Sequence, residues 1–188
     1  MKKEGVQEVD NWNYIHNINY LINNCVHDGR LTEGLYYAER LKCMPVNKYR
    51  KKVYEGTFFN QGLLAPAKMQ MAFGNWGKAA QQFDAVVDKD TAFGYTNMEF
   101  KNGLAFFVKG MDALVNNNIA EAEKYSTALD ALLWRNAKQT GKDSTLNPWY
   151  QNTLNTASLE IQGCMESYRG NYEPAIKLLE KAQKQEIE

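Results

Sequence analysis

The sequence of 188 residues has no excess of charge of either sign. Lys and Arg together number 22, and Asp and Glu together also number 22. A chain whose charges sum to zero has no long-range field that would attract a polyanion or a strongly basic partner. Nucleic acid is therefore not an expected ligand.

Long hydrophobic runs are also missing. The longest strictly apolar runs, such as "LAFFV" at 104–108, fall far short of the roughly 20 residues that a membrane span needs. The first residues, "MKKEGVQEVD", carry two lysines without an apolar stretch behind them, unlike a secretory signal. We expect no membrane partner. The compartment stays open: cytoplasmic on this chain alone, or exported if a leader was removed.

Paired cysteines and the common catalytic motifs are absent as well. Cys25, Cys43 and Cys164 are odd in number and widely spaced, with no CxxC pair, which argues against a zinc site or a redox pair. We predict that they are small buried apolar residues. The chain has no nucleophile elbow, Gly-rich phosphate loop or HExxH spacing. Catalytic residues, a metal and a cofactor are therefore not predicted, and an enzyme is not expected.

The two histidines are His16 and His27. At helical spacing they share a face with three other polar residues: Asn19, Tyr20 and Asn23. Eleven residues of helix span about 16 Å, too far for both histidines to hold one ion. His27 also lies about 200° around the helix from Cys25, so it is not a base for that thiol. A polar face that contacts a partner is favoured, and a hydrolase or metal-binding protein using the His16 region is the minor alternative.

What the chain does contain is one spacing of small and large residues, repeated four times. Counted from Gly170, the positions seven before and five, nine and twelve after are Gly163, Ala175, Leu179 and Ala182. Counted from Gly74, they are Ala67, Ala79, Phe83 and Val86. Weaker copies surround Asn117, with Gly110, Ala122, Ser126 and Leu129, and Gly29, with Gly34, Ala38 and Leu41.

This spacing has a physical reason in the pairing of helices. Small residues let two helices approach closely, and large residues one or two turns away fill the groove beside them. Gly or Asn at the turn tolerates the left-handed conformation that ends a helix. Each copy is therefore predicted to be a helical hairpin that buries its apolar face against the next one.

The sequence thus predicts an all-α chain of about four hairpins and about eight helices. The expected helices cover 9–27, 31–43, 48–73, 76–88, 95–115, 119–137, 148–168 and 172–186, and no segment has the alternation of a strand. The third helix is expected to break near Gly62 or Pro66. Residues 136–149 form the one long loop, and Asn147 with Pro148 is a good helix start. We expect a single repeat domain over 1–188.

Two segments carry a resemblance to a known family. "MESYRGNYEPAIKLLEKA" and "MAFGNWGKAAQQFDAVV" resemble the tetratricopeptide repeat, in which a small residue is followed seven later by Gly, then by an aromatic residue, Ala and an aromatic residue or Leu. "YIHNINYLINNCVHDGRLTEGLYYAERL" is similar to a group of uncharacterised bacterial tetratricopeptide-repeat proteins. The resemblance implies an α-solenoid that serves as a non-catalytic scaffold for protein–protein interaction.

The resemblance also implies a binding surface. In the family, the first helix of each hairpin lines the concave face, which binds a peptide or a helix. The positions that correspond here are Asn19, Asn23, Leu64, Lys68, Met71, Phe107, Met111 and Leu114. Two alternatives stay open: the apolar members of this set are ordinary core, or the chain is a segment of a longer protein that packs mainly against the rest of it, including flanking domains.

Overall fold

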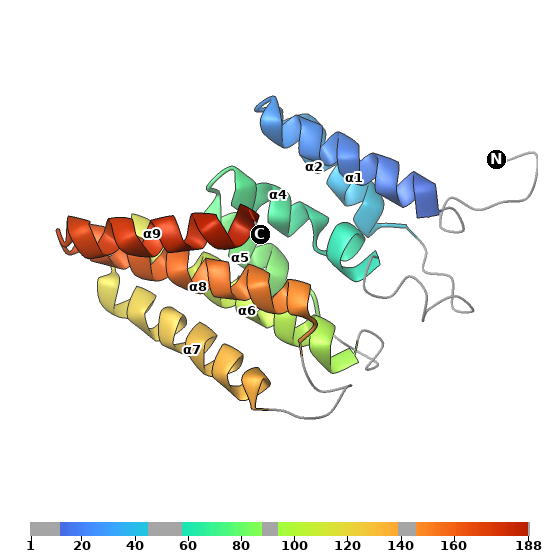
Figure 1. Ribbon diagram of the computed structural model, residues 1–188. Helices are drawn as coiled ribbons and strands as arrows, with labels where there is room; N and C mark the ends of the chain where they lie inside the picture. Colours follow the sequence, from blue (N-terminus) through green and yellow to red (C-terminus); the bar gives the residue numbers. More distant parts are fainter. Residues whose placement is uncertain (1–11, 45–57, 88–93, 139–145, 188) are drawn as a thin grey trace, which may run out of the picture. The chain divides into compact units, whose positions relative to one another are not determined.

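The computed structural model describes residues 12–44, 58–87, 94–138 and 146–187 (Figure 1). Every regular element in these ranges is helical, in agreement with the all-α prediction. The helices are α1 (Trp12–His27), α2 (Leu31–Lys42), the π-helix η3 (Phe58–Leu63), α4 (Ala65–Ala72), α5 (Trp76–Asp84), α6 (Gly94–Val115), α7 (Ile119–Ala137), α8 (Pro148–Tyr168) and α9 (Tyr172–Ile187).

The predicted helix 48–73 differs from the structure in one informative way. Its described part consists of two elements, η3 and α4, which are separated at Leu64. Pro66 lies in the first turn of α4, where its missing N–H costs no hydrogen bond and its ring does not collide with a preceding turn. The break predicted near Gly62 or Pro66 is therefore confirmed. Residues 45–57, which make up the first part of that prediction, lie outside the described ranges.

The four predicted turns share one backbone conformation. Gly29, Gly74, Asn117 and Gly170 have φ values of 71°, 68°, 55° and 81°. At Gly170, the N–H of that residue donates to the carbonyl of Ser167 (3.0 Å) and the next N–H donates to the carbonyl of Glu166 (2.9 Å). The same two bonds recur at the other three turns. They define a Schellman motif, which ends a helix and redirects the chain.

A side-chain contact also recurs in the two best copies. Asn75 Nδ2 donates to Gln70 Oε1 over 2.8 Å, and Asn171 Nδ2 donates to Glu166 Oε2 over 2.7 Å. In both pairs, the residue that follows the turn glycine donates to the residue that lies four positions before that glycine. The two segments that resemble the repeat family thus share a turn in backbone and in side-chain detail.

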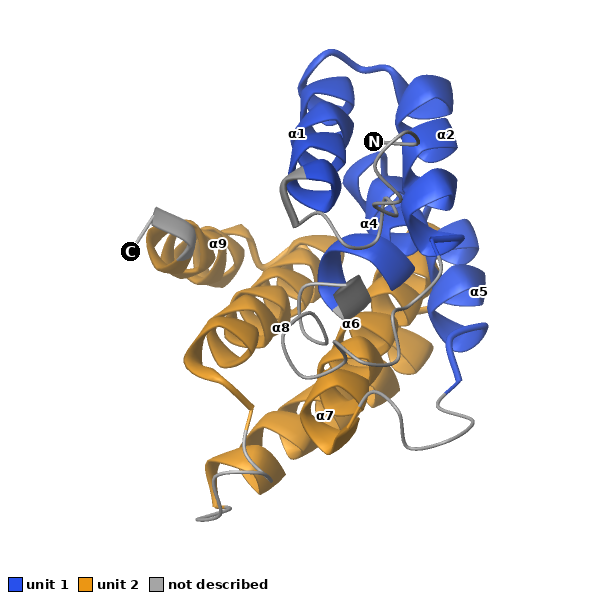
Figure 2. Cartoon of the chain, turned by 90° about the vertical axis from the view of Figure 1, so that its right-hand side faces the viewer, with its two compact units in different colours: residues 1–93 blue, residues 94–188 orange. Residues whose placement is uncertain are grey.

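The chain divides into two compact units, residues 1–93 and 94–188 (Figure 2). In the first unit α1 packs on α2, α4 packs on α5, and α2 contacts α4. In the second unit α6 packs on α7, α8 packs on α9, and α8 contacts both α6 and α7. Each unit therefore contains two hairpins in chain order. A single repeat domain and a regular solenoid stay predictions.

The core of the first unit is built on the inner face of α1. Ile15, Ile18, Ile22 and Cys25 recur every three to four residues and pack with residues of α2 and α4. The predicted small residue Gly34 lies where α2 meets α4. A Cβ at this position would lie 2.0 Å from the terminal methyl carbon of Met69, so glycine is what allows this close contact.

The core of the second unit depends on two glycines of α6. A Cβ at Gly103 would lie 2.6 Å from a methyl carbon of Leu154, and one at Gly110 would lie 2.0 Å from the δ-methyl carbon of Ile161. Both large residues come from α8. The predicted small residues are buried in all four hairpins: Gly34, Ala67, Ala79, Gly110, Ala122, Gly163 and Ala175.

Candidate functional site

The predicted groove residues of the first unit differ in exposure. Asn19 and Asn23 lie on α1, where Asn23 is exposed and Asn19 is half-buried. Lys68 and Met71 lie on α4 and are half-buried, whereas Leu64 just before α4 has no exposed surface. The asparagines and Met71 keep surface that a ligand could contact, but Leu64 belongs to the core.

The predicted groove residues of the second unit lie on α6. Phe107 is 5% exposed and Leu114 is 0% exposed, while Met111 is half-buried. A side chain without accessible surface offers a partner no contact area. The burial of Leu64, Phe107 and Leu114 therefore favours the alternative in which the apolar positions of the predicted groove are core.

Lys68 is the one predicted groove residue with a shifted pKa. Its Nζ donates to Asn60 Oδ1 over 3.1 Å, and burial lowers the pKa of Lys68 to about 8. Removal from water disfavours the charged form of an amine. We therefore expect Lys68 to lower the stability of the fold wherever it is protonated in both the folded and the unfolded chain.

Replacing Lys68 with Met is expected to stabilise the protein by about 2 kcal/mol at pH 7. A pKa lowered from 10.5 to about 8 corresponds to about 3 kcal/mol, and loss of the Asn60 hydrogen bond offsets about 1 kcal/mol. The folded pKa is depressed, so Lys68 lowers stability fully below pH 8, and this effect fades as the pH rises towards 10.5. Urea denaturation of both proteins at several pH values measures it.

The pH dependence is the internal control of that experiment. Burial also raises the pKa of Cys25 and Cys164, and these thiols affect both proteins equally. Only the difference between the wild-type chain and Lys68→Met isolates the amine. A stability difference that stayed constant from pH 7 to pH 10 would show that Lys68 is not destabilised by burial.

The polar face of α1 is present as predicted. Asn23 and His27 are exposed, and the ring of His16 contacts that of Tyr20 edge-on, with centroids 4.5 Å apart. In the described part of the chain, His, Cys, Asp and Glu form no group of three or more that could hold a metal ion. None of its helices is long and apolar enough to cross a membrane.

The prediction that all three cysteines are buried is correct for one of them. Cys25 has no exposed surface, Cys164 is half-buried, and Cys43 is exposed. Cys43 follows the last residue of α2, at the end of the helix and outside its buried stripe. The repeat spacing does not extend to this position, so it gave no information about its burial.

Among the residues that the structure describes, α9 has more exposed large apolar side chains than any other helix. Tyr172, Ile176 and Leu179 are 67%, 57% and 38% exposed, and their spacing of four and three residues places them on one side of the helix. We call these three residues the apolar face of α9. On the inner side, Ala175 and Ala182 are only 3% exposed, since α9 packs on α8.

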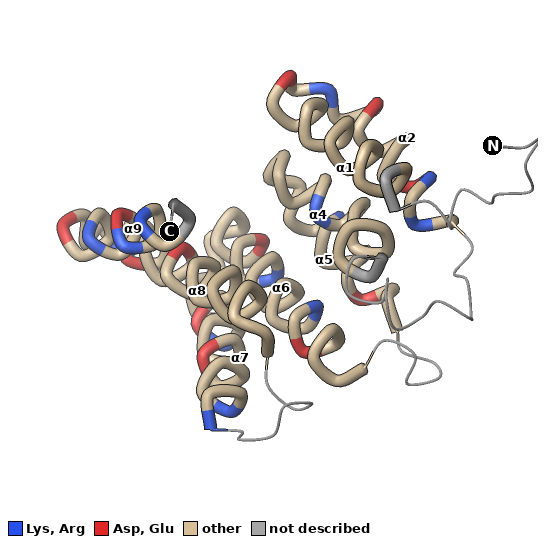
Figure 3. Tube along the Cα trace, turned by 45° about the vertical axis from the view of Figure 1, so that its right-hand side comes forward, with Lys and Arg blue, Asp and Glu red and all other residues tan. Residues whose placement is uncertain are grey.

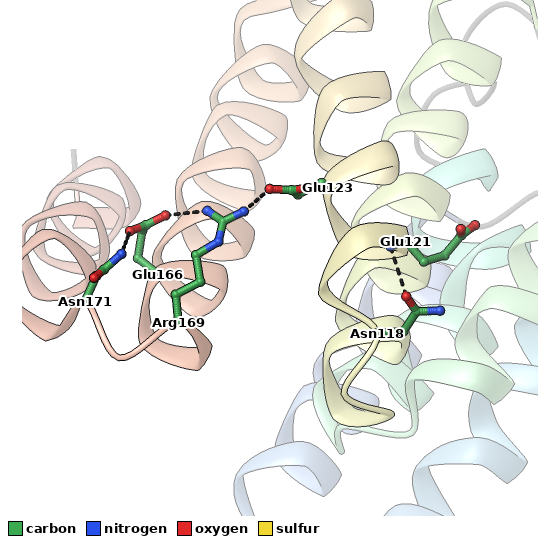
Figure 4. A network of polar contacts seen from close by, with 6 residues as sticks. All are labelled: Asn118, Glu121, Glu123, Glu166, Arg169 and Asn171. Carbon is green, nitrogen blue, oxygen red and sulfur yellow. Dashed lines mark hydrogen bonds and ion pairs between the residues drawn. The ribbon is translucent and has the colours of Figure 1, made fainter.

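A comparison with α7 shows how unusual this surface is. Glu123 of α7 and Ile176 of α9 both lie six residues after their turn residue. Glu123 forms an ion pair with Arg169, the residue that caps α8 (Figure 4). Seven residues further on in α7, Asp130 accepts hydrogen bonds from Ser158 (2.5 Å) and Gln162 (3.1 Å) of α8. This side of α7 is polar and forms polar contacts with α8, whereas the matching side of α9 is apolar and exposed.

The chain matches no protein-family model, no curated protein and no solved structure.

A polar cleft of about 390 Å³ lies between α7, α8 and α9. It is lined by residues such as Asp130, Ser158, Lys181 and Gln185. The Ser158 hydroxyl donates to Asp130, but an aspartate alone is a weak base for a serine, and the two histidines belong to α1 in the other unit. The contacts of Asp130 instead join α7 to α8.

The polar network at the hairpin turns is also structural. Arg169 bridges Glu123 on α7 and Glu166 on α8, and Asn171 donates to the same Glu166 (Figure 4). Asn118 caps α7 by accepting from the N–H of Glu121 over 3.2 Å. These contacts fix helix ends and hold α7 beside α8. Leu179 packs in part against Gly163 of α8, but the packing of this unit does not explain the exposure of Tyr172 and Ile176 on the apolar face of α9.

Proposed function

We propose that this chain is a non-catalytic protein-interaction module of tetratricopeptide-like helical hairpins, and that it binds its partner through the apolar face of α9. The exposure of Tyr172, Ile176 and Leu179 carries the proposal. Contiguous exposed apolar residues on one helix are typical of surfaces that bind other proteins. Tyrosine in particular supplies a large contact area at little cost in side-chain entropy.

The expected concave face is not the contact surface that we propose. Leu64, Phe107 and Leu114 have almost no accessible area, so a ligand would have to unpack the core to reach them. An amphipathic helix that lays its own apolar side on α9 needs no such rearrangement. The repeated Schellman turns support the hairpin part of the proposal, since they set consecutive helices side by side.

The proposal is tested by comparing what the immobilised chain captures from an extract of its source cells. The first variant combines Tyr172→Ser with Ile176→Ser. The matched control combines Val115→Ser with Trp134→Ser, which removes two equally exposed apolar side chains from α6 and α7. We expect recovery of specific partners to fall about tenfold or more with the α9 variant and to be unchanged with the control.

Folding of each variant is checked by circular dichroism before capture. Partners that bind the folded α9 variant and the wild-type chain equally well would contradict the proposed surface. Loss of the same partners from both variants would contradict it too, because it would indicate a general effect of surface hydrophobicity.

A further inference from the structure

Resting on the proposed function, we infer that the partner bound by the apolar face of α9 is a second copy of this chain, with the two α9 helices antiparallel. The first observation is the charge pattern beside the apolar face. Four exposed residues, Glu173, Lys177, Glu180 and Lys184, lie within an arc of about 60° at 100° per residue. We call them the charged row. Figure 3 shows charged residues of both signs along α9.

The order of charges in this row has a particular symmetry. It alternates acid, base, acid, base, so reversing its direction exchanges every acid with a base. About a point between residues 178 and 179, Glu173 corresponds to Lys184 and Lys177 corresponds to Glu180. A second α9 that runs antiparallel therefore brings opposite charges together, whereas a parallel copy in register brings like charges together.

Two residues of the apolar face have nearly the same centre. Ile176 and Leu179 are equidistant from a point between residues 177 and 178, within about one residue of the centre of the charged row. The third, Tyr172, lies opposite the polar Gln183 in this arrangement. A two-fold axis at this place packs Ile176 of each copy against Leu179 of the other. Ile176, Leu179 and the charged row thus agree on one antiparallel register.

The polar face of α1 does not offer an equivalent surface for head-to-tail assembly. Its exposed residues are Tyr20, Asn23 and His27, so it would place an amide and an imidazole opposite the apolar face of α9. Burial of amides without hydrogen-bond partners is unfavourable. Pairing of α9 with itself matches Ile176 with Leu179 and each acid of the charged row with a base.

The size of the surface sets the expected strength. Sixteen residues make α9 about 24 Å long, so one helix face from each copy buries less than the roughly 1,200 Å² of a standard stable interface. We expect a dissociation constant in the micromolar to millimolar range. Ion pairs at the exposed edge of an interface contribute more to orientation than to affinity, so the apolar face supplies most of the binding energy.

Sedimentation of the full chain over a concentration series tests self-association. The acidic variant carries Lys177→Glu and Lys184→Glu, and the basic variant carries Glu173→Lys and Glu180→Lys. Each variant alone is expected to raise the dissociation constant at least about tenfold, because its charged row becomes uniform in sign. An equal mixture of both is expected to dimerise again. Normal dimerisation of either variant alone, or no recovery in the mixture, would overturn the role of the charged row.

Cysteine cross-linking tests the orientation. In a background with Cys43→Ser and Cys164→Ser, one chain carries Tyr172→Cys and another carries Gln183→Cys. An antiparallel dimer is expected to form a disulfide between the two different chains when they are mixed, and little between identical chains. Efficient cross-linking of Tyr172→Cys to itself would instead indicate a parallel pair and overturn the inference.

Failure of this inference is distinguishable from failure of the proposed function. A wild-type chain that stays monomeric throughout the concentration series overturns self-pairing. If capture of a different protein is nevertheless lost in the variant with Tyr172→Ser and Ile176→Ser, the apolar face remains the contact surface. If that capture is also unaffected, the proposed function fails as well.

Discussion

Replacing Phe100 with alanine is expected to destabilise the second unit by about 4 kcal/mol. Phe100 has no exposed surface, and its ring stacks on that of Tyr150 with centroids 3.9 Å apart and planes 7° from parallel. The substitution removes apolar area and the aromatic contact between α6 and α8, and it leaves a cavity that neighbouring side chains fill only in part. A loss of this size is large compared with the whole stability of a typical domain.

Chemical denaturation measures the loss of unfolding free energy in Phe100→Ala, and hydrogen exchange shows which helices are affected. Exchange of amides in α6 and α8 should accelerate in Phe100→Ala, because both helices lose the same packing contact. Trp149→Ala is the matched control: it belongs to the same aromatic cluster but is 54% exposed, so we expect a change below about 1 kcal/mol. Equal losses in the two variants would mean that the stack is not part of a tightly packed core.

The hydroxyl group of Tyr150 contributes less to the stability of the second unit than its ring does. Its hydroxyl donates to Asn97 Oδ1 over 2.7 Å, and burial raises the pKa of Tyr150 to about 12. The hydroxyl therefore keeps its proton, and with it the hydrogen bond, throughout the physiological pH range. A net contribution near 1 kcal/mol is usual for such a bond, so the ring contact with Phe100 dominates the interaction between α6 and the start of α8.

The turns and most helix limits could be predicted from the sequence because their causes are local, whereas α5 ends at Asp84, before the predicted limit at residue 88. Gly29, Gly74 and Gly170 tolerate a positive φ that other residues avoid, and Asn117 is one of the few side chains that also does so. Asn147 accepts from the N–H of Tyr150 over 2.8 Å, as the predicted helix start requires. Each of these signals depends on residues within one turn of helix.

The partners of the small residues were not predictable in the same way. The spacing shows that Gly110 and Gly163 need a close neighbour, but it does not say which one. Gly110 lies against Ile161 of the next hairpin, whereas Gly163 lies against Leu179 of its own hairpin. The difference follows from the position nine residues after the turn, which is Ser126 in α7 and Leu179 in α9. Leu179 is large enough to fill the space beside Gly163 in its own hairpin. Ser126 is smaller, so the corresponding space beside Gly110 is filled by Ile161 of the next hairpin.

The groove residues were predicted from the positions that line the concave face in the repeat family. The sequence itself already indicated that the apolar residues among them would be buried. The segment "LAFFV" in α6 is apolar at five consecutive positions, which gives a helix without a polar side at that level, as is typical of a buried helix. Leu104, Phe107 and Val108 are indeed no more than 5% exposed.

For α9, the sequence indicated more clearly that apolar side chains extend beyond the contact with one neighbouring helix. Its apolar residues continue around the helix beyond Ala175 and Ala182 to Tyr172 and Ile176. A single partner helix covers only part of such a wide apolar arc. The exposed remainder became visible only when the contact of α9 with α8 was known, because the arc alone does not tell which side the hairpin partner occupies.

Replacing Gly110 with leucine is expected to cost about 3 kcal/mol, the second largest effect. Even a single Cβ at this position would lie 2.0 Å from the δ-methyl carbon of Ile161 and 3.5 Å from the Cβ of Tyr125. A larger side chain must therefore separate α6 from both α7 and α8, and overpacking of this kind costs about 1–3 kcal/mol. The better helix propensity of leucine recovers less than about 1 kcal/mol.

A double variant shows whether the close contact with Ile161 is the cause. Ile161→Ala alone should destabilise by about 3 kcal/mol because it leaves a cavity, but in the presence of Gly110→Leu the new side chain fills that cavity. We expect the two losses to be non-additive by about 1–3 kcal/mol in denaturation experiments. Ala131→Leu on the exposed side of α7 adds similar volume without a neighbour and should have little effect. Strict additivity of Gly110→Leu and Ile161→Ala would show that α6 and α8 do not meet at this glycine.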